Sequence, residues 1–265
     1  MHIKTVDTDK FSMDYCRFGS GKKTMVIIPG LSVQSVMPAA DAIEAVYRKF
    51  EDDYTVYVFD RRREVPDPYS VKDMARDTVS AIKALGLKDI YLCGASQGGM
   101  MAQVIAIENP ELVKKLAIAS SSAHVKDEQY KVLKNWRDLA EAGDREGLYL
   151  AFGKEIYPPE VFEQYKSALI AAAATVTDEE LRRFVILAEG IKGFDITGEL
   201  DRIQCPVLAV GDADDKVLDS DATMEIAEKL DEKSGFMLFM YNGFGHAAYD
   251  TAPGFTDRLF RFFED

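Results

Sequence analysis

The segment from Ile90 to Gly99 contains the residues best suited to covalent chemistry. An apolar run passes through Gly-x-Ser-x-Gly, with Ser96 at its centre, into a helix-forming stretch that begins at Gln97. A tight strand-to-helix turn of this kind projects a serine hydroxyl clear of a sheet, and the flanking glycines leave room for the turn. The pattern predicts Ser96 as a nucleophile. Because helix starts present free backbone N–H groups, we expect Gln97 to donate to an oxyanion.

A serine nucleophile needs a base within hydrogen-bond reach, and histidine most often serves. The chain has three histidines. His2 reads as a surface residue on the first strand, and His124 follows a strand, where it is a candidate for lining a substrate pocket. His246 lies in a glycine-rich loop after the last apolar strand. Strand ends are where α/β sheets place functional groups, so we predict His246 as the base.

A carboxylate must orient the imidazole and stabilise its cationic form. Asp214 and Asp215 both follow the apolar strand 206–211, and both lie between Ser96 and His246 in the chain. The residues alone leave either aspartate open as the third member of a catalytic triad.

The elements that must position these residues alternate along the chain. Short β-rich runs separated by helical patterns predict a mostly parallel, eight-stranded sheet flanked by helices, with an antiparallel hairpin at one edge. No strand-like run appears between Val125 and about Leu200. We therefore expect an α/β core formed by residues 1–124 and 201–265, and a helical cap formed by residues 125–200.

These features together resemble the α/β-hydrolase superfamily. In that family the acid follows a strand-ending glycine as Gly-x-x-Asp-x-x-Val, which Gly211, Asp214 and Val217 match. The resemblance implies Asp214 as the acid, with Asp215 in reserve. The loop after the third strand reads Pro-Gly-Leu where relatives read His-Gly and an apolar residue, which implies the N–H of Leu31 as the second oxyanion donor. The segment after the fourth strand departs from the family pattern, since Arg61, Arg62 and Arg63 follow one another there.

The resemblance implies a serine hydrolase that works through an acyl-enzyme and needs no metal or organic cofactor. Aromatic residues in the cap, Trp136 and Tyr157 among them, favour small apolar carboxylic esters as substrates. Alternatives on the same triad are a C–C bond hydrolase, a small-peptide aminopeptidase, a perhydrolase or an acyltransferase. A ligand-binding sensor with residual hydrolase activity is the alternative of another class.

Charge and composition limit the partners. The formal net charge of −13 disfavours nucleic acid and anionic membranes, and the arginine run 61–63 reads as a solvated or salt-bridged turn. The three widely spaced cysteines favour a reducing compartment, and no stretch is long and apolar enough to span a membrane. We expect a cytoplasmic enzyme acting on a small molecule, with its oligomeric state left open.

Overall fold

The computed structural model describes residues 2–265 and is built on one sheet of eight strands in the order β1-β2-β4-β3-β5-β6-β7-β8. β1 and β2 form an antiparallel hairpin, β2 pairs antiparallel with β4, and the remaining pairs are parallel. The predicted eight-stranded, mostly parallel α/β fold is confirmed. The strands are β1 His2–Asp7, β2 Ser12–Phe18, β3 Lys23–Ile28, β4 Tyr54–Arg62, β5 Ile90–Ala95, β6 Val113–Ala119, β7 Val207–Asp212 and β8 Phe236–Tyr241.

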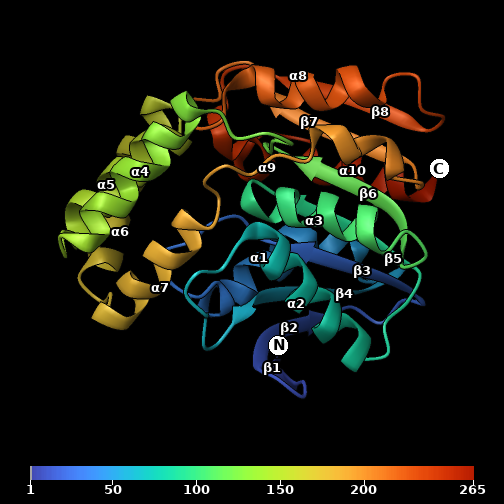
Figure 1. Ribbon diagram of the computed structural model, residues 1–265, viewed down its shortest axis with the longest axis horizontal. Coiled ribbons are helices and arrows are strands. Elements are labelled where there is room, and N and C mark those ends of the chain that lie inside the picture. The colour runs from blue at the N-terminus through green and yellow to red at the C-terminus, as the bar shows by residue number, and fades with distance from the viewer. Residues whose placement is uncertain (1) are drawn as a thin grey trace.

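Helices cover both faces of the sheet (Figure 1). The helices are α1 Ala40–Tyr47, α2 Val71–Ala84, α3 Gln97–Glu108, α4 Asp127–Glu141, α5 Arg145–Ile156, α6 Pro159–Ala173, α7 Asp178–Glu189, α8 Asp219–Leu230, α9 Ala248–Thr251 and α10 Phe255–Glu264. Buried residues of α2, α3 and α8 share one core cluster, and those of α1, α9 and α10 share another.

Alternation along the strands explains why the sheet has two apolar faces. In β3, Val26 and Ile28 belong to the core under α2 and α3, whereas Met25 and Ile27 belong to the opposite core. Successive side chains of a strand point to opposite faces, so an unbroken apolar run is buried on both sides. Helix α3 is buried along almost its whole length, which places its first residue, Gln97, in the interior.

Four helices, α4 to α7, follow β6 and lie together at one side of the sheet (Figure 1). The connections that enter and leave this group run side by side, since His124 and Asp195 form an antiparallel bridge. The Val125 N–H donates to the Phe194 carbonyl at 2.9 Å, and the Ile196 N–H donates to the Ala123 carbonyl at 2.9 Å. We propose that residues 125–200 form the cap, because the chain leaves and re-enters the core at one place.

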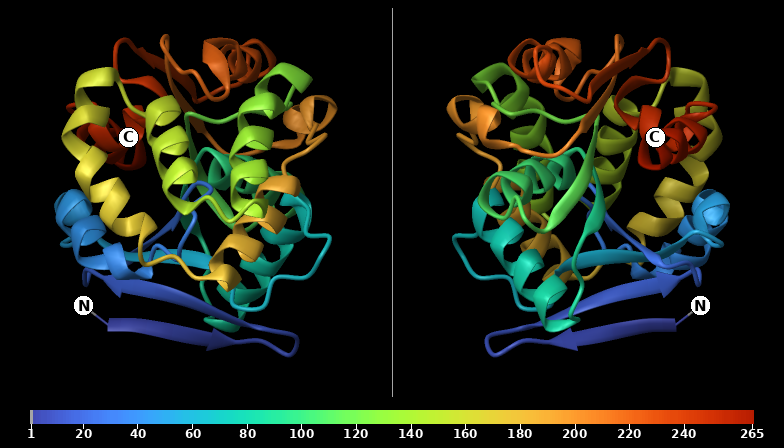
Figure 2. Two further views of the ribbon diagram at one scale, coloured as in Figure 1. Left: turned by 90° about the vertical axis from the view of Figure 1, so that its left-hand side faces the viewer. Right: turned by 90° about the vertical axis from the view of Figure 1, so that its right-hand side faces the viewer.

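The β1–β2 hairpin lies at the opposite edge of the molecule from β8 (Figure 2). Nowhere between residues 2 and 265 does a helix have the length and apolar character needed to cross a bilayer.

All three cysteine thiols are buried and free of disulfides. Burial raises the pKa of the Cys16 and Cys205 thiols to about 11 and that of Cys93 to about 12. Because the thiolate is the reactive form, we expect the native protein to react with an aromatic disulfide reagent at pH 8 far more slowly than the protein unfolded in urea. The unfolded protein should release three equivalents of the reagent's thiol, one for each cysteine. Rapid native reaction would show that a thiol is accessible. The compartment itself stays a prediction.

Candidate active site

Ser96 stands at the turn between β5 and α3 in a strained backbone conformation. Its φ is +52° and its ψ is −122°, values that L-residues rarely adopt and that cost free energy. The turn is tight because neighbouring backbone leaves no room for side chains: a Cβ on Gly94 would lie 2.3 Å from the Gly98 carbonyl oxygen, and one on Gly98 would lie 2.0 Å from that of Ile28. The motif glycines therefore let strand, helix and serine pack together.

His246 reaches Ser96 from the loop after β8. Its Nε2 lies 2.9 Å from Ser96 Oγ, and its Nδ1 lies 2.8 Å from Asp215 Oδ2. The imidazole is 3% exposed, and the carboxylate is buried as well. The other oxygen of Asp215 accepts from the N–H groups of Val217 at 2.8 Å and Leu218 at 3.1 Å. These bonds orient the carboxylate, and the carboxylate in turn selects the tautomer with the proton on Nδ1.

The structure corrects the prediction of Asp214 as the acid. The turn after β7 directs Asp214 outward, where it is exposed, and Asp215 inward, where it is buried. The Oδ2 of Asp214 accepts from the N–H of Gly243 at 2.9 Å, while Asp215, one residue on, returns to the buried side and contacts His246. Asp214 stabilises the loop that carries His246 without contacting the imidazole.

Asp212 braces the same loop, a role for which the sequence offered only its place after a buried strand. Its Oδ2 accepts from the N–H of Phe244 at 3.0 Å, and the residue is 1% exposed. Two carboxylates from the end of β7 thus hold the loop that carries His246.

Two backbone segments meet beside Ser96. A Cβ on Gly30 would lie 3.1 Å from Ser96 Cβ, which shows how closely the loop after β3 approaches the serine. Leu31 follows in that loop, and Gln97 is the first residue of α3. Within residues 2–265, neither backbone N–H donates to a protein acceptor. Both groups therefore remain available as the oxyanion donors proposed from the sequence.

An apolar cavity of about 370 Å³ adjoins this site. Gly30, Leu31 and Ala95 line it beside the serine, Phe152 and Tyr157 line it from the cap, and Asp250 lines it from α9. Asp250 is the only charged residue among the described residues of this lining. It is exposed, and partial desolvation by the surrounding cavity wall raises the pKa of its carboxyl group. No sequence pattern singled out Asp250, because α9 is a single helical turn.

Of the three predicted pocket residues, Tyr157 lines this cavity and the other two lie elsewhere. His124 belongs to the strand-like bridge at the base of the cap. Trp136 is 2% exposed and packs on Phe152 with ring centroids 4.4 Å apart. The assignment of His124 and Trp136 to the pocket was wrong. His124 lies in the segment that connects β6 to the cap, and Trp136 packs inside the cap.

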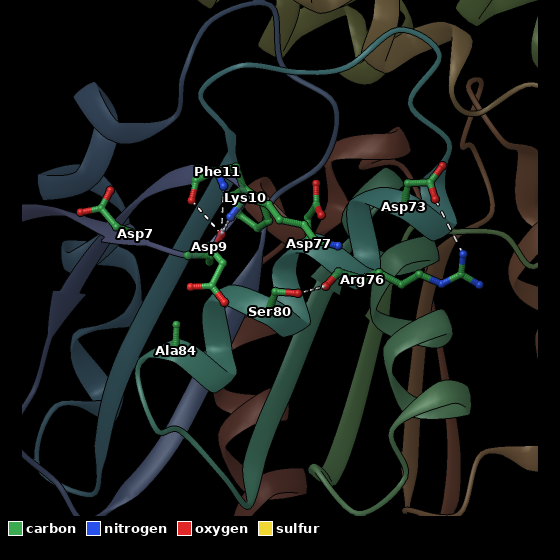
Figure 3. Close-up of a pocket in the computed structure, with 10 residues that line it drawn as sticks. Asp7, Asp9, Lys10, Phe11, Asp73, Arg76, Asp77, Ser80 and Ala84 are labelled. Atoms are coloured by element: carbon green, nitrogen blue, oxygen red, sulfur yellow. Dashed lines mark hydrogen bonds and ion pairs between the residues drawn. The ribbon is translucent and has the colours of Figure 1, made fainter.

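A second cavity, of about 510 Å³, lies between the β1–β2 turn and α2 (Figure 3). Figure 3 shows that its charged side chains come from the hairpin and one helix face, and Arg76 pairs with Asp73 at 3.7 Å. Its described lining contains no histidine and shares no residue with the site around Ser96. In the same span of 2–265, no cluster of three or more His, Cys, Asp or Glu side chains is arranged to hold a metal ion.

Comparison with known proteins identifies the fold. A family model described as alpha/beta hydrolase fold matches residues 23–148. An α/β-hydrolase from a Medee basin deep-sea metagenome library, MGS-M2, superposes with a TM-score of 0.88 at 19% identity, covering 99% of this chain and 98% of that one. The chain has the α/β-hydrolase fold.

Curated proteins with similar sequences carry hydrolase names. The putative carbamate hydrolase RutD of Caulobacter segnis is 26% identical over 201 residues, which cover 75% of this chain and 74% of RutD. The mouse serine hydrolase BPHL is 25% identical over 142 residues, or 50% of this chain. That match spans about half of BPHL's length, 47%.

Proposed function

We propose that this α/β-hydrolase is a serine hydrolase that cleaves small apolar carboxylic esters through an acyl-enzyme. The main support is the chain of hydrogen bonds beside an apolar cavity: Ser96 Oγ lies 2.9 Å from His246 Nε2, and His246 Nδ1 lies 2.8 Å from Asp215 Oδ2. A serine activated by histidine and aspartate is the arrangement that acyl transfer needs.

In the proposed cycle, Ser96 Oγ attacks the ester carbonyl carbon while His246 Nε2 takes the hydroxyl proton. The N–H groups of Leu31 and Gln97 stabilise the oxyanion, and Asp215 stabilises the imidazolium. The tetrahedral intermediate collapses to an acyl-enzyme as His246 donates the proton to the leaving alcohol. Water, activated by His246, then releases the acid and restores Ser96.

The cavity supports the choice of acyl group. Its walls are aliphatic and aromatic apart from Asp250 and a few hydroxyls, and its volume of about 370 Å³ suits a short-to-medium chain. We expect p-nitrophenyl esters of graded acyl length to give a clear optimum in kcat/KM, with Ser96→Ala as the blank. Flat rates across the series would contradict an acyl group bound in this cavity.

Asp250 should discriminate against anionic acyl chains. We expect the neutral p-nitrophenyl hexanoate to be preferred over the ester of the same length that ends in a carboxylate. Asp250→Asn should reduce that preference by roughly 3- to 10-fold, because it removes a like-charge repulsion of about 1 kcal/mol. The preference in the wild type should rise with pH, since deprotonation of a carboxyl with a raised pKa creates the repelling charge.

Asp257→Asn is the matched control for this measurement. Asp257 lies on α10, pairs with Lys49 at the surface, and does not line the cavity. Equal effects of the two substitutions on the ratio of kcat/KM values would rule out a local role for Asp250.

A carbamate is the second candidate substrate, because the relative matched over three quarters of this chain is named a putative carbamate hydrolase. The same nucleophile would form a carbamoyl-enzyme. Turnover of an aryl carbamate faster than that of the best ester would favour a carbamate as the substrate.

A further inference from the structure

The three consecutive arginines at the end of β4 and directly after it, Arg61 to Arg63, occupy different environments. Arg63 is exposed and pairs with Asp14 at 2.8 Å, and Arg62 pairs with Asp77 at 3.3 Å. Arg61 is only 4% exposed, so the interpretation of the whole run as a solvated or salt-bridged turn is wrong for this residue. A buried guanidinium needs an explanation, because desolvating a charge is costly.

Arg61 bonds to both segments that supply the proposed oxyanion donors. Its Nη2 donates to the Pro29 carbonyl at 2.8 Å and to Gln97 Oε1 at 3.0 Å. Pro29 belongs to the loop that leads to Leu31, and Gln97 begins α3. One nitrogen of Arg61 therefore joins the loop after β3 to the start of the helix that follows the nucleophile.

The Gln97 side chain extends this connection to the cap. Its Nε2 donates to the Leu187 carbonyl in α7 at 2.8 Å, and the side chain is completely buried. A second contact joins the same helix to the end of β4, where Arg183 Nη2 lies 2.9 Å from Asp60 Oδ1. Helix α7 is thus attached to the residues around Arg61 at two points.

The cost of burying Arg61 argues for more than packing. Burial lowers the pKa of its guanidinium to about 10, so the group still carries its charge at neutral pH. Its Nε is buried, and none of the described residues accepts a hydrogen bond from it. An apolar side chain would fill this space without a desolvation penalty, but it could not donate to the two acceptors on different segments.

We propose that Arg61 is a positioning residue. It holds the Pro29–Leu31 loop and the start of α3 at the separation that their two oxyanion donors require. The Gln97 side chain links these two segments to helix α7 of the cap. The inference rests on the proposed hydrolysis by Ser96. Arg61 acts through the backbone donors and touches no reacting atom.

The test compares Arg61→Met with Arg63→Met, which removes an exposed arginine from the same run. Two quantities are measured: kcat and KM for the best p-nitrophenyl ester, and the inhibition constant of a trifluoromethyl ketone with the same acyl chain. Ser96 Oγ adds to the ketone carbon, His246 takes the proton, and the former carbonyl oxygen becomes an oxyanion held by the two N–H groups. This inhibitor therefore reports the oxyanion site directly.

For Arg61→Met we expect kcat to fall about 10- to 100-fold and KM to change less than about twofold. The inhibition constant should rise by about the same factor by which kcat falls. The reason is that complete loss of one oxyanion donor lowers kcat about 100-fold or more. Arg63→Met should match the wild type. An Arg61→Met enzyme that matches Arg63→Met in both quantities would overturn the proposal. So would a rise in KM alone, which would assign Arg61 to the pocket.

If Arg61→Met does not fold, Gln97→Met provides the test, since it removes the bridging amide and keeps the backbone N–H. We expect the same pattern of lower kcat and weaker inhibition, and unchanged values would overturn the proposal. Hydrolysis that persists in Ser96→Ala would overturn the proposed function and this inference together. Ser96-dependent hydrolysis that is insensitive to Arg61 and Gln97 would overturn the inference alone.

Discussion

Ser96→Ala should lower kcat for ester hydrolysis by a factor on the order of 10⁴ to 10⁶ and abolish covalent labelling by a serine-directed phosphonate. The hydroxyl is the group that His246 contacts at 2.9 Å, and no alcohol remains at that position in the variant. Labelling is followed by intact-protein mass spectrometry and turnover by p-nitrophenol release. Stability should change little, because alanine keeps a Cβ in the same strained backbone.

Ser120→Ala is the matched control for the nucleophile. Ser120 directly follows the neighbouring strand β6, is 1% exposed, and has an Oγ with no hydrogen-bond partner among residues 2–265. Its loss should leave labelling and turnover close to those of the wild type. Phosphonate labelling that survives in Ser96→Ala would place the nucleophile elsewhere in the chain.

Asp215→Asn should lower kcat by a factor on the order of 10⁴, whereas Asp214→Asn should lower it less than about tenfold. An asparagine at 215 no longer accepts from Nδ1 with a full negative charge, so the imidazole loses its preferred tautomer and its stabilised cation. Among residues 2–265, the Asp214 carboxylate accepts a hydrogen bond from the N–H of Gly243, at 2.9 Å, and from no other group. Both variants are measured by steady-state hydrolysis of the best ester.

The two aspartates are adjacent in sequence and identical in chemistry, so each variant controls for the other. Phosphonate labelling of Asp215→Asn should be much slower than that of the wild type, because Ser96 keeps its place and loses its activation. A larger loss from Asp214→Asn would mean that the geometry at the end of β7 differs in the working enzyme.

The fold was predictable because its signals are local. Unbroken apolar runs such as β3 and β7 predict strands buried on both faces, and the Gly-x-Ser-x-Gly turn is recognisable since Gly94 and Gly98 have no room for a Cβ. The absence of strand-like runs after Val125 likewise indicated the helical insertion. His246 could be singled out because so few histidines were available to serve a serine.

What the tertiary structure alone decided is which neighbours touch. Whether Asp214 or Asp215 meets His246 depends on the path of the turn after β7, which propensity does not resolve. The buried role of Arg61 depends on acceptors 32 and 36 residues away in the chain, and the pocket position of Asp250 depends on how α9 meets the loop after β3. The sequence by itself determined the elements and indicated Ser96 and His246 as the proposed nucleophile and base. The packing of distant segments determined which carboxylate contacts His246, what lines the cavity and what supports the proposed oxyanion site, because these arise from contacts that no local pattern encodes.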